Sequence, residues 1–274
     1  MSDAGADGSD RGGPGGEAGR RYDLYGDAFK RDPHATFAAM RREAPIHKQA
    51  GLDGTTPIWF VTRYADVEAM LRDKRFVRDE RLAKDEADRY AWSPLDRRIN
   101  TQMLNRDGQD HRRLRDLVSQ GFTPKRVADL RPRVEAIAEE FLAHLQEVAG
   151  RSGGVADLIT EFSFPLPTTV ILEMLGIPIE DRDRFRAWGN ALLAPPMTEE
   201  GQKESARLLT EFAEYLDALF EERRARPRDD LVSALVAAEQ EGDRLSPEEL
   251  SSTLVLLIVA GHETTVNLIA NGVL

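Results

Sequence analysis

The spacing of apolar side chains predicts a chain that is mainly helical. Apolar residues recur every three or four positions, which is the period of an amphipathic α-helix, over residues 33–43, 64–71 and 123–145. Proline borders the first and third of these stretches, at Pro33, Pro45 and Pro124, as expected because proline cannot continue a helix. The same reasoning predicts further helices over residues 165–175, 181–193, 199–226 and 247–274, and one that begins after Asp229 or Asp230.

Two short segments near the start predict strands instead. Residues 45–48 and 58–62 are separated by a Gly-Leu-Asp-Gly turn, and the second is rich in aromatic and β-branched side chains. The region from Arg78 to Asp110 shows little periodicity, and we expect it to be mostly loop. The sequence therefore indicates a mainly α protein with a small β-hairpin near its N-terminus.

The last predicted helix has the clearest start. Ser246 opens a Ser-Pro-Glu-Glu capping box with proline at the first helical position. A helix over residues 247–274 would be about 40 Å long at ~1.5 Å per residue, which is the span of a whole domain. We expect it to cross the interior, and we expect Leu274 to be a cut rather than a natural end.

Composition narrows the class of protein. A net charge of −11 argues against a general nucleic-acid or anionic-membrane binder, because both need a basic surface. The absence of cysteine excludes disulfides and thiolate ligands from this chain. Residues 1–21, rich in Gly, Asp and Ser, predict a disordered leader, and the longest apolar run, residues 254–260, is too short to span a bilayer. We therefore expect a cytoplasmic protein.

A polar pentapeptide, residues 261–265 (Gly-His-Glu-Thr-Thr), interrupts the apolar pattern of the last helix. Glycine costs about 1 kcal/mol relative to alanine inside a helix, and an unpaired glutamate in an apolar environment costs more. Thr264 is placed to donate a hydrogen bond to the carbonyl of Ala260, which would bend the helix and leave a backbone group for water. An equal alternative is a simple kink with Glu263 paired to an arginine elsewhere.

Helical geometry places the small and polar residues of this region together. Small residues there would let a flat ligand lie against the backbone, beside a carboxylate. The residues that share this face are Leu256, Val259, Ala260, Glu263 and Thr264, with Gly261 at its margin.

A second polar cluster precedes the helix predicted over 123–145. His111 and Arg115 lie four residues apart, so both reach one anionic group if the segment is helical. Between Arg106 and Arg133 there are eight Lys or Arg against four Asp, which makes a local basic patch on an acidic protein. For a charge run taken alone, a solvated helix face with surface salt bridges is the more common explanation.

Together the two motifs resemble the cytochrome P-450 family of haem-thiolate monooxygenases. Residues 260–265 look like the family's [AG]-G-x-[DE]-T-[TS] signature in the long central I helix, and His111 to Arg115 looks like its H-x-x-x-R helix. Their order, the strand at 59–62 and the Pro-Pro break at 194–197 agree with this resemblance. It covers residues 22–274 and implies the N-terminal part of that fold, ending within the central helix.

The resemblance implies a role for each of these residues. His111 and Arg115 would bind the propionates of heme b, and Ala260 and Gly261 would lie against the ring. Glu263 and Thr264 would deliver protons for oxygen activation, while Leu256 and Val259 would face a small apolar organic substrate. The break at residues 194–197 would belong to the lid over that substrate. A ferredoxin or flavodoxin-type electron donor would dock on the basic patch, at Arg112, Arg113, Lys125 and Arg126.

One part of the family pattern is missing. The cysteine loop and the E-x-x-R helix of the family follow the central helix, and neither is present here. The resemblance therefore predicts an incomplete domain without its haem-thiolate region, inactive by itself, from a monooxygenase that hydroxylates a small molecule with O2. A haem-free helical binding or scaffold protein is the alternative. Haem ligation by a histidine (34, 47, 111, 144 or 262) is a third, less favoured one.

Overall fold

The computed structural model describes residues 22–51, 56–82, 93–193, 198–240 and 243–274. The contacts divide the chain into two compact units, Met1–Phe76 and Val77–Leu274, and each is described by itself. The predicted leader, residues 1–21, and the predicted break at 194–197 lie outside the described residues. The prediction of one incomplete domain over residues 22–274 stays a prediction.

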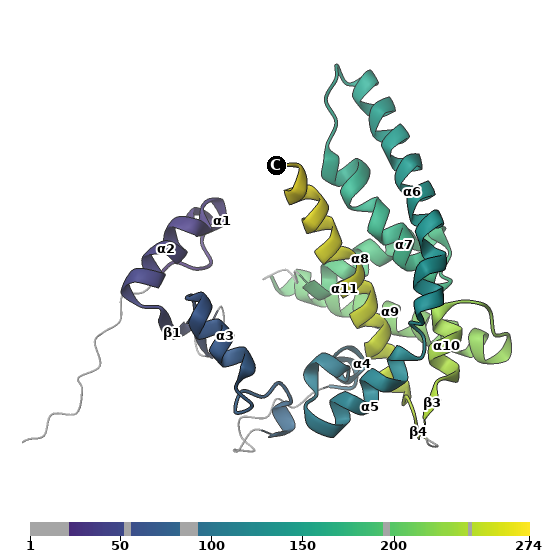
Figure 1. The fold of residues 1–274 in the computed structure, drawn as a ribbon, viewed down its shortest axis with the longest axis horizontal. Helices are drawn as coiled ribbons and strands as arrows, with labels where there is room; N and C mark the ends of the chain where they lie inside the picture. Colours follow the sequence, from purple (N-terminus) through teal and green to yellow (C-terminus); the bar gives the residue numbers. More distant parts are fainter. Residues whose placement is uncertain (1–21, 52–55, 83–92, 194–197, 241–242) are drawn as a thin grey trace, which may run out of the picture. The chain divides into compact units, whose positions relative to one another are not determined.

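The first unit contains the predicted hairpin (Figure 1). Strands β1 (Ile46–Ala50) and β2 (Pro57–Val61) pair antiparallel, with Ile46 opposite Val61. Helices α1 (Asp27–Arg31), α2 (Pro33–Glu43) and α3 (Tyr64–Arg72) complete the unit. Its small core is formed by Tyr22, Leu24 and Met40, which is fully buried. The two predicted strands and the helices over 33–43 and 64–71 are thus confirmed.

The described residues of the second unit form helices and turns, together with one very short hairpin. Helix α11 lies beside α7 and also contacts α4, as Figure 1 shows. The elements of this unit are the 3-10 turns Glu80–Leu82, Met103–Asn105 and Ile179–Asp181, the helices α4 (Pro94–Asn100), α5 (Gly108–Ser119), α6 (Pro124–Arg151), α7 (Pro165–Leu175), α8 (Arg182–Leu193), α9 (Glu199–Ala225), α10 (Leu231–Ala237) and α11 (Pro247–Val273), the π-helical segment Ile159–Ser163, and the strands β3 (Glu239–Gln240) and β4 (Asp243–Arg244).

Local capping residues set the ends of these helices as the sequence predicts. The Thr123 hydroxyl accepts a hydrogen bond from the backbone N–H of Arg126 at the start of α6. Ser246 and Glu249 form the predicted capping box of α11, with reciprocal bonds of 3.1 and 2.8 Å. Asp230, rather than Asp229, caps α10 by accepting from the N–H of Ser233. Such caps satisfy N–H groups that a helix leaves without partners.

The hydrophobic core of the second unit is formed mainly by side chains of the five helices α7, α8, α9, α10 and α11. Trp188 of α8 is fully buried and stacks on Phe212 of α9, with ring centroids 4.8 Å apart. The first half of α11 is buried as far as Ile258, and the second half, from Ala260 onward, is half-buried or exposed. The prediction that α11 crosses the interior holds for its first half.

The segment from Arg78 to Asp110 is more structured than predicted. Its described residues contain the 3-10 turns Glu80–Leu82 and Met103–Asn105, helix α4 and the start of α5, where the sequence analysis expected mostly loop. Ser93 and Asp96 form a capping box around Pro94, and Arg97 donates to Glu248 of α11 at 3.1 Å. The prediction failed because a helix of seven residues is too short to show periodicity, although its cap was visible in the sequence.

Helix α11 is long and apolar enough to cross a membrane, judged by length and composition, and 22% of its most apolar window is buried. The core helix of a soluble protein passes the same test, so this single helix is weak evidence for a membrane span.

Candidate functional site

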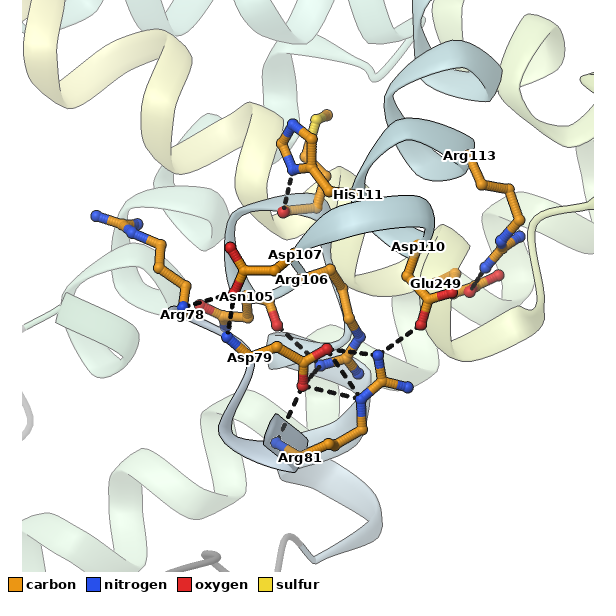
Figure 2. A network of polar contacts seen from close by, with 11 residues as sticks. Arg78, Asp79, Arg81, Asn105, Arg106, Asp107, Asp110, His111, Arg113 and Glu249 are labelled. Atoms are coloured by element: carbon orange, nitrogen blue, oxygen red, sulfur yellow. Dashed lines mark hydrogen bonds and ion pairs between the residues drawn. The ribbon is translucent and has the colours of Figure 1, made fainter. Parts of the chain in front are cut away.

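The start of α5 is fastened to an earlier segment by one carboxylate. Asp107, the residue before α5, accepts hydrogen bonds from the backbone N–H groups of Arg78 and Asp79, at 2.6 and 2.8 Å (Figure 2). Its side chain makes no capping bond to α5 itself. Asp107 therefore fixes residues 78–79 against the N-terminus of the helix that carries His111.

A partly buried charge network lies beside this contact, and Figure 2 shows its members converging below α5. Asp79 is 3% exposed and accepts from the Arg81 guanidinium, which also reaches Asp110 at 2.5 Å. Hydrogen bonds from Arg81 hold the pKa of Asp79 below its ordinary value, in spite of burial. Burial lowers the pKa of Arg106, whose guanidinium lies 3.8 Å from Asp79. The network fixes the loop before α5 by charge pairing.

His111 is oriented by a backbone carbonyl. Its Nδ1 lies 2.9 Å from the carbonyl oxygen of Met103 and must donate, because a carbonyl only accepts. The Nε2 atom is left for a ligand. A pocket of about 430 Å³ opens next to this side chain, lined by Arg78, Met103, Leu104, Arg106, Asp107, Gly108, His111 and Arg112.

Arg115 lies one turn beyond His111, on α5 as predicted. Its side chain is exposed, and within the described part of the chain it has no acidic partner. It does not line the pocket beside His111. Their shared binding of one anionic group stays a prediction, since a ligand would have to extend from the pocket to Arg115.

Three side-chain bonds to backbone carbonyls four residues earlier mark the polar part of α11. Thr264 donates to the carbonyl of Ala260 at 2.8 Å, which confirms the predicted contact. Thr265 donates in the same way to Gly261 at 3.2 Å, and His262 Nδ1 lies 2.7 Å from the carbonyl oxygen of Ile258. The segment nevertheless remains α-helical without a break. Each of these carbonyl oxygens accepts the side-chain bond in addition to its helical backbone bond. The extra bond polarises the carbonyl without interrupting the helix.

The predicted face of α11 is open in this chain. Ala260, Glu263 and Thr264 are exposed, whereas Leu256 and Val259 are half-buried. Glu263 has no ion-pair partner in the described ranges, so the expected alternative, a pairing with a distant arginine, is absent there. The face is therefore available to a group from outside these residues.

Gly261 has a packing role that the sequence analysis missed. A Cβ atom at this position would stand 3.2 Å from Cδ1 of Ile171 on α7, closer than ordinary van der Waals contact. The glycine thus permits the approach of α7 and α11. Contact with a flat ligand stays a prediction for Gly261, and its neighbour Ala260 lies on the exposed side.

The helices α5 and α11 meet away from the polar pentapeptide. Arg113 of α5 pairs with Glu249 in the first turn of α11. Ala260 follows Glu249 by eleven residues, about 16 Å along the helix at 1.5 Å per residue. The structure therefore brings the two motifs onto neighbouring helices but does not bring His111 into contact with the residues 260–264.

The four residues of the predicted basic docking patch differ in their surroundings. Arg113 pairs with Glu249 and with Asp243, and Arg126 pairs with Asp229 at 3.1 Å. Arg112 and Lys125 are exposed and have no acidic partner among the described residues. A docking partner would therefore meet two free positive charges rather than four.

Comparisons with known proteins agree with this arrangement. The Cytochrome P450 family profile matches residues 51–274. Vitamin D(3) 25-hydroxylase of Pseudonocardia autotrophica is 41% identical over 257 residues, which cover 93% of this chain and 60% of that protein. The polyketide biosynthesis cytochrome P450 PksS of Bacillus subtilis is 40% identical, over 91% of this chain and 61% of its own length.

Solved structures show the same likeness. A myxobacterial cytochrome P450 in complex with myristic acid matches with a TM-score of 0.79 and 41% identity, over 91% of this chain and 61% of that one. Bacillus subtilis PksS matches with a TM-score of 0.77 and 39% identity, over 90% and 60% of the two chains. The chain belongs to the cytochrome P450 family. It spans about 60% of the length of these relatives and has the N-terminal part of their fold.

The family implies a haem, and the residues present fit one side of it. The free Nε2 of His111 and the unpaired Arg115 suit carboxylates, and the exposed face at residues 260–264 suits a flat group. None of the 274 residues is cysteine, so a thiolate ligand would have to come from outside them. The described residues also contain no group of three or more His, Asp or Glu side chains suited to holding a metal ion.

Proposed function

We propose that this chain forms part of a haem-dependent monooxygenase that hydroxylates a small apolar molecule with O2. The observation that carries the proposal is the hydrogen bond from Thr264 to Ala260 beside an exposed Glu263 that has no ion-pair partner among the described residues. That geometry leaves both lone pairs of the Thr264 hydroxyl oxygen free to accept from water. Membership of the family supports the reaction class.

The residues of α11 would have different roles according to their position along the helix. Haem, when bound, would supply the oxygen chemistry. Glu263 would exchange protons with solvent at its carboxylate, and the Thr264 hydroxyl oxygen would hold a water in the path, which is general acid catalysis through water. Leu256 and Val259, one and two turns earlier, would face an apolar substrate and exclude water from it.

The α5 helix would hold the cofactor's carboxylates. His111 Nε2 would donate to one carboxylate in the imidazolium form, since Nδ1 is committed to the Met103 carbonyl. Arg115 would meet a carboxylate with its planar fork. Asp107 would support both by fixing the start of the helix.

The charges of this chain support a proposal for its electron donor and for its location in the cell. An acidic ferredoxin or flavodoxin-type donor would dock against Arg112 and Lys125, because Arg113 and Arg126 are already paired inside the chain. A cytoplasmic location accords with the acidic composition. As a chain without cysteine, these 274 residues would not catalyse the reaction alone.

Binding of protoporphyrin IX, which contains no iron and needs no thiolate, tests the carboxylate contacts directly. We expect fluorescence titration to show binding, weakened about tenfold by Arg115→Gln and by His111→Gln, since each removes a charge-assisted hydrogen bond. The dimethyl ester of the porphyrin should bind the wild type and both variants alike. Arg131→Gln, at an exposed arginine of α6 paired within its own helix, is the control.

Two outcomes would contradict the proposal. Equal binding of the free acid to all variants would remove the role of α5. No binding of either porphyrin would favour a haem-free scaffold, the alternative function for this fold.

A further inference from the structure

A second small pocket of the second unit has the features of an anion site. It holds about 220 Å³ and lies between α6, the π-helical segment Ile159–Ser163 and α8. Phe141, Phe164 and Pro165 give it an apolar wall. Short π-helical turns often occur where a protein binds something, and this one presents Thr160 and Glu161 to the pocket.

Two arginines of α8 line this pocket without acidic partners. Arg182 and Arg186 lie one helical turn apart, and neither forms an ion pair within the described ranges. The Arg186 guanidinium lies 4.8 Å from the centroid of the Phe164 ring, which orients its plane. By contrast, Arg184 between them is paired with Asp181 and Glu211. The lack of partners is thus a property of the pocket side of α8.

The carboxylates near the pocket do not neutralise these arginines. Glu161 is held by His144, with Nε2 2.9 Å from Oε2, so its charge faces the imidazole. Asp183 also lines the pocket, but its side chain is exposed and bonds to neither arginine. The two guanidinium groups therefore line the pocket beside its apolar wall without an ion pair to Glu161 or Asp183 in the described residues.

We propose that this pocket binds a small organic carboxylate that carries a ring or short apolar body. The carboxylate would lie between Arg182 and Arg186, each of which offers parallel N–H donors. The apolar body would contact Phe164 and Phe141. The site is separate from the α5 and α11 residues assigned to haem, and the inference does not rest on the proposed function.

Isothermal titration of the 274-residue chain with benzoate, at low salt, tests this site. We expect a dissociation constant of about millimolar size, typical of a small ligand held by two ionic contacts. The double variant Arg182→Gln/Arg186→Gln should bind about tenfold more weakly or worse. Arg182→Lys/Arg186→Lys, which keeps both charges but loses the planar forks, should lie between the two.

Matched controls separate the pocket from general charge. Arg131→Gln/Arg226→Gln removes two positive charges from exposed arginines outside the pocket and should bind benzoate as the wild type does. The ring signals of His144 in a proton–carbon NMR spectrum should move on benzoate addition, and those of His34 should not. Neither pocket arginine has an ion pair to lose within the described part of the chain, so the far-ultraviolet circular dichroism of the double Gln variant should match the wild type.

Three results would overturn the inference. Benzoate that fails to bind shows that the pocket takes no such ligand. Equal binding to the wild type and the double Gln variant shows that the arginines do not hold it. Inorganic phosphate that binds as tightly as benzoate shows that the apolar wall contributes nothing and that the ligand is not an organic carboxylate.

Discussion

Arg223 and Asp230 form a buried ion pair, with the arginine Nε 2.6 Å from Oδ2 of the carboxylate. The same guanidinium donates to the carbonyl of Gly176 at 2.6 Å, and the same carboxylate caps α10. Three helices, α7, α9 and α10, are therefore joined through two side chains. Arg223 is 1% exposed, so its charge depends on this one acidic neighbour and on Glu222.

Replacing this carboxylate should destabilise the second unit strongly. We expect Asp230→Ala to lower the free energy of unfolding by about 3–5 kcal/mol, because it leaves a buried guanidinium poorly compensated and removes the α10 cap. Urea unfolding measures the change. The control is Asp229→Ala, whose side chain is 99% exposed and pairs only with Arg126 at the surface. A similar loss in both variants would show that the buried pair has no special weight.

Gly176 has both a positive φ and a close neighbour at its Cβ position, whereas Gly153 has the positive φ alone. Its φ is +70°, and a Cβ there would stand 2.1 Å from Oδ2 of Asp230. Gly153 has a φ of +69° with nothing within 4 Å of its Cβ position. We expect Gly153→Ala to cost about 1 kcal/mol from backbone strain alone, and Gly176→Ala to cost clearly more. Equal thermal shifts in the two variants would exclude a contribution from the close approach to Asp230.

The charge network before α5 should make stability depend on acid pH. The folded pKa of Asp79 lies below its unfolded value of 3.8, so its contribution is present above that pH and is lost as pH falls through the folded pKa. Unfolding measured from neutral pH down to below about pH 4 should show a smaller acid loss in Asp79→Asn. Arg81→Gln, which removes the hydrogen bonds that lower this pKa, should have the same effect. An unchanged slope in both variants would contradict the linkage.

Adjacent threonines on α11 provide a matched test of proton delivery. In the haem-loaded enzyme we expect Thr264→Ala to raise oxygen consumption per product formed by about tenfold, while Thr264→Ser retains coupling. Thr265→Ala removes the same kind of bond, to Gly261, from the next position and should leave coupling nearly unchanged. The ratio of oxygen consumed to product measures both. Coupling that is unaffected in Thr264→Ala would remove this residue from the proton path.

Local signals in the sequence predicted most of the helices and their ends. Thr123, Asp230 and Ser246 each cap a helix by accepting a hydrogen bond from the backbone N–H three residues later. The local sequence was therefore enough to predict where these helices begin. Helix α4 was missed because its seven residues are too few to show periodicity, and its contact with α11 through Arg97 and Glu248 joins residues 151 positions apart. A pattern read along the chain does not contain that contact.

The sequence predicted the motifs of the candidate site, but it did not predict which residues of other helices surround them. The bond from Thr264 to Ala260 follows from helical spacing alone, and the structure contains it. The pairing of Arg113 with Glu249 depends on how two helices meet, and the sequence analysis assigned that arginine to the basic docking patch. The contact of Gly261 with Ile171 was hidden for the same reason.

The approach of α7 to α11 at Gly261 has a consequence for variation among relatives. Because a Cβ at residue 261 would stand 3.2 Å from Cδ1 of Ile171, a larger residue at 261 requires that side chain to move by a few tenths of an ångström or to be shorter. Alanine at 261 together with valine at 171 would restore the total bulk. The two positions should therefore change together, even though ninety residues of chain lie between them.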